Sequence, residues 1–84
     1  MSGVKVTVVY FGQAREIAGV KEDEFTLASP ARIEHAFAKS IDVHPGLARI
    51  KEIIRPLLNG QWTEREAELK DGDRVALLPP AGGG

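Results

Sequence analysis

The chain has 84 residues, enough for one domain with one small core. Eleven basic and twelve acidic residues leave a formal net charge of -1, which gives no reason to expect nucleic acid or an acidic membrane as a partner. No cysteine is present, which excludes disulfides, a thiolate nucleophile and a zinc–thiolate site and suits a reducing compartment.

The first predicted element is a strand from Val4 to Phe11. Alternation places Tyr10 on a core face, while the opposite face turns from polar at Lys5 to apolar at Phe11. This run is too short, and too polar at alternate positions, for a signal peptide or a membrane-spanning helix. We therefore expect a cytoplasmic protein.

A short helix should run from Gly12 to Gly19, with Gly19 as its C-terminal cap. A second strand follows from Glu24 to Leu27. Ser29-Pro30 predicts the start of the main helix, because serine suits the N-cap and proline the first helical position. The apolar stripe of this helix, expected against the sheet, is Ile33, Ala36, Phe37 and Ile41.

The second half of the chain predicts short strands joined by turns. Residues 47–52 read as a helical turn, and residues 53–58 as a strand that Pro56 makes an edge or bulged strand. Asn59-Gly60 is a strong hairpin signal, with residues 61–63 as the return strand. A turn at residues 71–73 precedes the last strand, Arg74 to Leu78.

The order of elements predicts an α+β fold. The main helix provides a right-handed crossover, which places the last strand parallel to the first. A mixed sheet with one main helix across one face is a ubiquitin-like β-grasp. We expect residues 1–80 to form this domain and residues 81–84 to form a flexible glycine tail.

The sequence contains no pattern for catalysis by this chain alone. His35 and His44 have no carboxylate neighbour in the sequence that would make a metal pair, and a solvated or partly packed histidine is the simpler interpretation. Gly12 and Gly19 do not frame a phosphate-binding loop, since no Lys-Ser/Thr follows. We expect no metal site and no permanently bound cofactor.

An exposed apolar patch is predicted on the face of the sheet away from the helix. If Val75 and Leu77 point inward, Leu78 points outward, and Phe11 does so by the same count. The two should be close where their parallel strands end, and Trp62 on the hairpin could join them. Such a cluster usually marks a binding surface. The alternative is a register shift of one residue, which would bury Phe11 and Leu78.

The C-terminus carries the most informative feature, a slender arm that follows the last strand. Pro79-Pro80 sets its direction, and Ala81 leads to Gly82, Gly83 and Gly84, which have no side chains. The α-carboxylate of Gly84 is then the candidate reactive group. Alone, a run of terminal glycines also fits a frayed end or a cloning remnant.

The chain resembles the MoaD/ThiS family of β-grasp sulfur carriers, to which the small subunit of molybdopterin synthase belongs. The resemblance is end to end and is strongest in two segments. One is Tyr10-Phe11-Gly12-Gln13-Ala14-Arg15-Glu16-Ile17-Ala18-Gly19, and the other runs from Leu69 through Asp71-Gly72-Asp73 and Pro79-Pro80 to Gly84.

The resemblance implies a function without catalysis by the carrier itself. An E1-like (MoeB-like) enzyme would adenylate Gly84, and a sulfur donor would convert the acyl-adenylate to a thiocarboxylate, both being transient modifications. The large synthase subunit (MoaE-like) would dock on Phe11, Trp62 and Leu78 and receive the arm, residues 79–84, for sulfur transfer to precursor Z. Two alternatives remain open: a carrier for another sulfur pathway (thiamine, cysteine or a secondary metabolite), and a ubiquitin-like modifier joined to lysines through Gly84.

Overall fold

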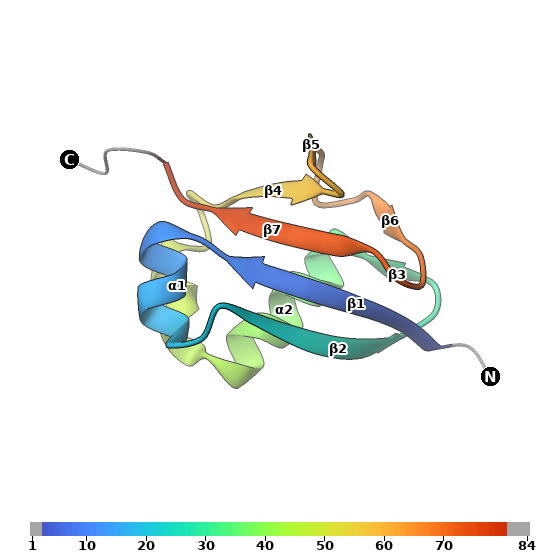
Figure 1. The fold of residues 1–84 in the computed structure, drawn as a ribbon, viewed down its shortest axis with the longest axis horizontal. Coiled ribbons are helices and arrows are strands. Elements are labelled where there is room, and N and C mark those ends of the chain that lie inside the picture. The colour runs from blue at the N-terminus through green and yellow to red at the C-terminus, as the bar shows by residue number, and fades with distance from the viewer. Residues whose placement is uncertain (1–2, 81–84) are drawn as a thin grey trace.

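The computed structural model describes residues 3–80, so the predicted tail at residues 81–84 lies outside the described part. Five strands form a mixed sheet in the order β2-β1-β7-β4-β5, and the main helix, α2, lies behind it in the view of Figure 1. The predicted ubiquitin-like β-grasp is confirmed. The elements are β1 (Gly3–Tyr10), α1 (Gly12–Ala18), β2 (Glu22–Ala28), β3 (Ala31–Arg32), α2 (Ile33–Val43), the 3₁₀ helix η1 (Pro45–Ile50), β4 (Arg55–Leu58), β5 (Gln61–Trp62), β6 (Glu68–Leu69) and β7 (Arg74–Leu78).

The first and last strands pair in parallel at the middle of the sheet, as predicted. The register aligns Val8 with Val75 and Tyr10 with Leu77. These four side chains are buried, so the predicted inward faces of both strands are confirmed. The other neighbour of β1 is β2, which is antiparallel and longer than predicted.

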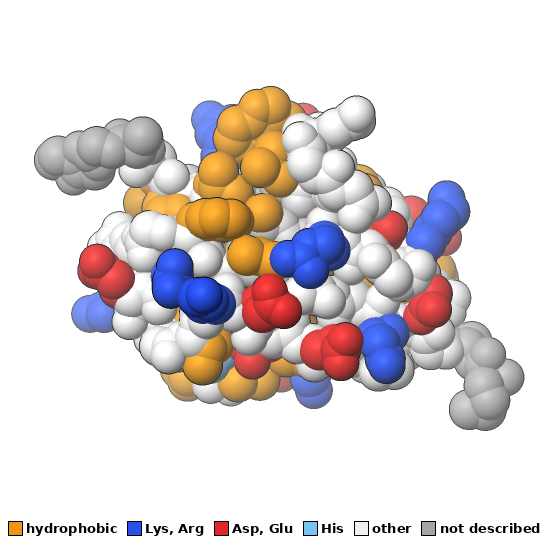
Figure 2. Space-filling view, viewed as in Figure 1, with side chains coloured by type: hydrophobic (Ala, Val, Ile, Leu, Met, Phe, Trp, Pro, Cys, Tyr) orange, Lys and Arg blue, Asp and Glu red, His pale blue; other side chains and the backbone are white. Residues whose placement is uncertain are grey.

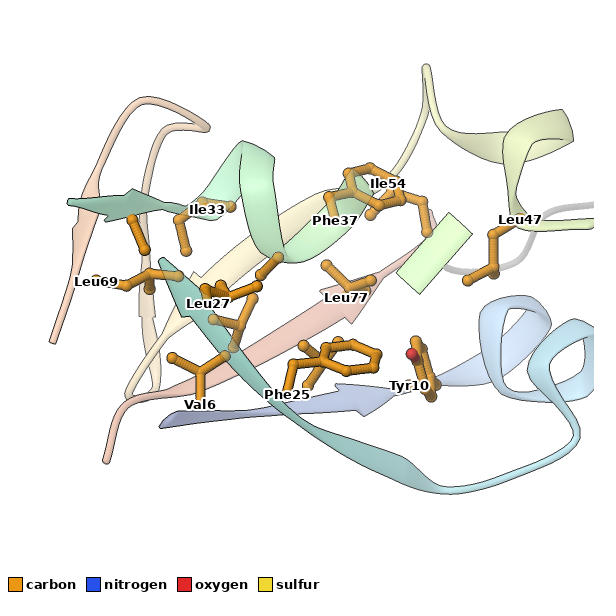
Figure 3. Packing of buried hydrophobic residues seen from close by; sticks show 14 of the residues in the cluster. Val6, Tyr10, Phe25, Leu27, Ile33, Phe37, Leu47, Ile54, Leu69 and Leu77 are labelled. Carbon is orange, nitrogen blue, oxygen red and sulfur yellow. The ribbon is translucent and has the colours of Figure 1, made fainter. Parts of the chain in front are cut away.

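The core lies between the inner face of the sheet and α2. Ile33, Ala36 and Phe37 are buried as the apolar stripe predicts, and Ile41 is half-buried against the same cluster. Figure 3 shows the ring of Phe37 beside Ile54 and Ile33 on the side of Leu69, within the same cluster of buried side chains. One face of α2 therefore holds the helix on the sheet, and the opposite face of the sheet is left uncovered.

The predicted start of the main helix is wrong. Ser29 and Pro30, joined by a cis peptide bond, precede the short strand β3, and α2 begins only at Ile33. The first amides of the helix need no serine cap, because loop carbonyls accept from them. Ile33 N–H donates to Ala67 O (3.0 Å) and Glu34 N–H to Arg65 O (2.9 Å).

The prediction that Pro56 marks an edge or bulged strand is also wrong. β4 lies between β7 and β5, and β5 is the edge. Pro56 O accepts from Thr63 N–H (3.3 Å), so the side of Pro56 that lacks a donor faces β5 and not β7. Since β5 pairs only with Leu57 and Leu58, the missing donor breaks no bond in the centre of the sheet. The Asn59-Gly60 hairpin is confirmed, with φ of 50° and 87°.

Candidate functional site

An apolar row crosses the outer face of the sheet, the face without helices. The strand registers align Val9 with Ala76, Ala76 with Leu57, and Leu57 with Trp62. Trp62 is 67% exposed, and the other three are half-buried. Figure 2 shows hydrophobic side chains gathered over β4, β5 and β7, while charged side chains lie over β1 and β2.

Phe11 and Leu78 lie at the end of this row. Phe11 falls one residue beyond β1, as the N-cap of α1, yet its N–H still donates to Leu77 O (3.3 Å). That bond extends the β1–β7 ladder and brings Phe11 beside Leu78. Phe11 is 47% exposed and Leu78 is half-buried, whereas Tyr10 and Leu77 are in the core. The register is therefore the predicted one, and the alternative that buries Phe11 and Leu78 is excluded.

We call the six residues of this surface the docking patch, after the binding role that the sequence predicts for Phe11, Trp62 and Leu78: Val9, Phe11, Leu57, Trp62, Ala76 and Leu78. The predicted patch contains Phe11, Trp62 and Leu78, and the structure adds Val9, Leu57 and Ala76. Alternation along β4 could have identified Leu57, because a residue next to an inward-facing Pro56 must face outward. Polar residues surround the patch, among them Arg74 and Glu22, which form an ion pair (3.5 Å).

The base of the C-terminal arm rests on the first turn of α1. Gly12 has a φ of +52°, a conformation that favours glycine, and its Cα faces the ring of Pro79. A methyl group at Gly12 would lie 3.4 Å from Pro79 Cγ. Pro79 and Pro80 thus leave the sheet beside Phe11. The rest of the predicted site, Ala81, Gly82, Gly83 and the reactive Gly84, lies outside the described residues.

A polar cluster lies under the end of β1. Tyr10 Oη donates to Asp23 Oδ2 (2.9 Å), and His44 Nε2 donates to the same oxygen (2.6 Å), because a carboxylate only accepts. The rings of Tyr10 and His44 meet edge to face, with centroids 5.5 Å apart. Burial raises the pKa of the Tyr10 phenol far above its usual value, and the Asp23 carboxylate adds to the shift.

His44 is half-buried and packs on Tyr10, which agrees with the interpretation of a partly packed histidine, and its carboxylate partner is Asp23. Asp23 is 21 residues away along the chain, so no local pattern could find the pair. His35 is exposed, and its Nδ1 accepts from the Arg32 backbone N–H (2.9 Å). Within residues 3–80, no group of three or more His, Cys, Asp or Glu could hold a metal ion, and no helix there has the length and hydropathy to cross a membrane.

Comparison with known proteins gives matches along nearly the whole chain. The family model described as the ThiS family matches residues 8–84. A molybdopterin synthase sulfur carrier subunit from Chlamydomonas reinhardtii is 39% identical, over 96% of this chain and all of the relative. A structure described as a putative molybdopterin converting factor, subunit 1, from Pyrococcus furiosus superposes with a TM-score of 0.83 at 32% identity, covering 93% of this chain and 99% of that one.

Two further structures bear on partners and on modification. One is a complex of subunits 1 and 2 of the molybdopterin-converting factor from Helicobacter pylori (TM-score 0.66, 29% identity, 96% of this chain and 100% of that one). The other is SAMP1 from Haloferax volcanii (TM-score 0.86, 25% identity, 95% and 99%). The fold, the terminal motif and these matches agree, and the chain belongs to the ThiS/MoaD family of β-grasp sulfur carriers.

Proposed function

We propose that this chain is the sulfur carrier subunit of a molybdopterin synthase. The observation that carries the proposal is the position of the docking patch. It ends at Phe11 and Leu78, where β7 continues into Pro79-Pro80 and then into the terminal glycines. A partner that covers the patch therefore receives the arm at the same time.

The chemistry is assigned to the carboxylate of Gly84. This carboxylate attacks the α-phosphate of ATP in an E1-like adenylating enzyme, which releases pyrophosphate and leaves an acyl-adenylate. A sulfide-level donor (HS⁻ or its equivalent) then forms the C–S bond as the C–O bond to AMP breaks, and loss of the S–H proton leaves a C-terminal thiocarboxylate. Adenylation is needed because a carboxylate alone is a poor electrophile, and AMP is a good leaving group.

The large synthase subunit is the proposed partner of the docking patch. The Helicobacter pylori complex joins a relative of this chain to a subunit 2, which supports an assembly of the same kind here. In that assembly residues 81–84 enter the active site of the large subunit, where sulfur passes to precursor Z. The large subunit supplies the bases and oxyanion donors, so the carrier is inactive alone. Because activation consumes ATP, we assign the protein to the cytoplasm.

The test is mass spectrometry of the intact chain after incubation with ATP, the adenylating enzyme and a sulfur donor. The expected product has one oxygen replaced by sulfur at the C-terminus. Deletion of Gly84, or one extra residue after it, should abolish this product while the circular dichroism spectrum stays unchanged. Sulfuration of the extended chain without trimming would contradict the assignment to Gly84.

The acceptor is tested in a second step. The thiocarboxylated chain is mixed with the large synthase subunit and precursor Z, and sulfur transfer to the pterin is followed. Transfer only to an acceptor enzyme of thiamine synthesis, or of another sulfur pathway, would contradict the molybdopterin assignment and leave the carrier function in place.

A second candidate function is a ubiquitin-like protein modifier, favoured by the likeness to SAMP1 at a TM-score of 0.86. In this case a lysine amine of a target protein would displace AMP from the acyl-adenylate, and an isopeptide bond to Gly84 would form. Stable conjugates in cells, without sulfur transfer to any small molecule, would favour this function over the first.

A further inference from the structure

A groove runs beside the docking patch, around the β5 edge of the sheet. One wall is the segment from Glu52 to Pro56, which leads into β4, and the other is the segment from Trp62 to Ala67. Pro80, at the base of the C-terminal arm, also lines the groove. Trp62 therefore belongs to both the docking patch and the groove.

Arg65 fixes the distance between the two walls. Its Nη2 donates across the groove to the carbonyls of Lys51 and Ile54, the second at 3.0 Å. The guanidinium also lies 4.7 Å from the centroid of the Phe37 ring in the core. Because these contacts tie both walls to the core, the groove is formed before any partner binds.

The open side of the groove combines apolar and acidic side chains. Ile53 is 47% exposed and Trp62 is 67% exposed, and both are large apolar residues. Glu52, Glu64 and Glu66 also line the groove, and in the described part of the chain none of them lies within 4.0 Å of a lysine or arginine nitrogen. Arg55 lines it too, whereas Arg65 is turned toward the carbonyls.

We propose that the large synthase subunit continues its interface from the docking patch into this groove. One apolar side chain of the partner lies between Ile53 and Trp62, next to a lysine or arginine that meets the carboxylates. This inference rests on the proposed function and extends it, since it names a second part of the docking surface and the chemistry that the partner must present there.

Three observations favour this occupant over others. The groove is continuous with the docking patch through Trp62. It is also lined by Pro80, next to the arm that the partner must hold. The third is size: a standard interface uses about 20–30 residues on each side, which is more than the patch and the arm provide. In such an interface, the three glutamates of the groove favour a basic partner surface over a second copy of the same groove.

The test measures the affinity of the full chain for the large synthase subunit by titration calorimetry, at low and at high salt. Ile53→Ser should weaken binding about tenfold, the loss expected when an interface contact is removed. Glu64→Lys should weaken it at low salt and less at high salt, because exposed charges are screened. Matched controls are Val43→Ser, an exposed apolar residue of α2, and Glu24→Lys on β2, at the opposite edge of the sheet.

Binding of both groove variants at wild-type affinity, with Leu78→Lys still defective, would overturn the groove and leave the proposed function standing. Wild-type binding by Leu78→Lys as well would reject the docking patch itself. Analytical sedimentation tests whether a second copy of the chain occupies the groove. Self-association that is abolished by Ile53→Ser would assign the groove to that second copy. The nuclear magnetic resonance signal of the Trp62 side chain is also compared between the free chain and a chain that lacks residues 81–84. A change in this signal would assign the groove to the chain's own C-terminus. Either result overturns the proposal.

Discussion

Gly12 supports the base of the C-terminal arm at Pro79, and a methyl group in its place would lie 3.4 Å from Pro79 Cγ. The contact depends on a backbone conformation, φ of +52°, that disfavours residues with a Cβ. The start of α1 and the end of β7 therefore constrain each other, and Gly12 is the residue at which this constraint can be tested.

Gly12→Ala should lower the free energy of unfolding by about 1–2 kcal/mol through the left-handed conformation, and Gly12→Asn by less, since asparagine tolerates it. The methyl group itself fits, because 3.4 Å is an ordinary contact distance. Denaturant unfolding measures the loss. Gly19→Ala is the control and should lose a similar amount, because Gly19 has a φ of +78° and no atom within 4 Å of an added methyl; a larger loss at Gly12 would measure the contact with Pro79. An unchanged stability of Gly12→Ala would show that the first turn of α1 relaxes.

The docking patch makes a prediction about affinity. Phe11→Lys or Leu78→Lys should weaken binding of the large synthase subunit by a few kcal/mol, as expected for residues near the centre of an interface. Stability should change little, because neither side chain is in the core. Calorimetric titration measures the loss, with Val43→Lys as an exposed control on α2. Unfolding of both patch variants would show that the patch has a structural role instead.

Trp62 offers a direct readout of docking because it is the only tryptophan in the chain. A carrier labelled with 5-fluorotryptophan should give one fluorine resonance, which shifts on addition of the unlabelled large subunit. The reason is that a side chain 67% exposed in the free chain is expected to become covered. A resonance that does not move while calorimetry reports binding would place Trp62 outside the interface.

The core makes a prediction about stability. Phe37→Ala should cost about 3–5 kcal/mol through lost burial and the cavity that remains. Its ring also supports the Arg65 guanidinium at 4.7 Å, so the groove should loosen as well. Against a total of roughly 5–15 kcal/mol for a domain, the variant would be marginal or unfolded. Thermal unfolding checks this, and a loss of less than about 1 kcal/mol, as at a surface position, would remove Phe37 from the core.

Tyr10 predicts a loss of stability in alkali. Its phenol has a raised pKa in the folded chain, so the unfolded chain loses this proton first as pH rises. The contribution of this phenol to the free energy of unfolding is fully present at pH values below the usual tyrosine pKa of about 10. Above that pH it falls by at most about 1.4 kcal/mol per pH unit. Unfolding free energies measured on both sides of this pH should show the fall. Tyr10→Phe should lack the part of the fall that comes from ionisation of the phenol.

The same experiment has an internal check, because Tyr10 is the only tyrosine in the chain. Tyrosinate absorbance should therefore appear together with unfolding, and not before it. Ionisation of Tyr10 at its usual pKa in a chain that is still folded would contradict both the burial and the Asp23 contact. All other groups are shared by the wild-type chain and Tyr10→Phe, so the difference between their stability curves isolates the phenol.

Alternation along the strands predicted the fold and the outward direction of Phe11 and Leu78. The inward and outward faces of β1 and β7 were correct to the residue, and these two strands position Phe11 and Leu78. Periodicity also identified Phe37 as a core residue of α2. These features follow from side-chain burial, which repeats regularly along a single element and can be counted in the sequence.

The errors arose where partners came from distant parts of the chain. Ser29-Pro30 has the composition of a helix start, but the amides of Ile33 and Glu34 find their acceptors at Ala67 and Arg65. The strands β3 and β6 have two residues each, too few to produce any period. The groove was missed for the same reason, since its second wall beyond Trp62 is tied to the carbonyls of Lys51 and Ile54 only through Arg65.

The central position of β7 has a mechanical consequence. In the proposed function the partner enzymes hold and release the arm, and any force on the C-terminus then reaches the domain through Pro79. β7 is bonded to β1 on one side and to β4 on the other. A pull along the arm therefore loads two rows of hydrogen bonds in shear, which must break together, whereas a terminal strand at an edge could be peeled off one bond at a time.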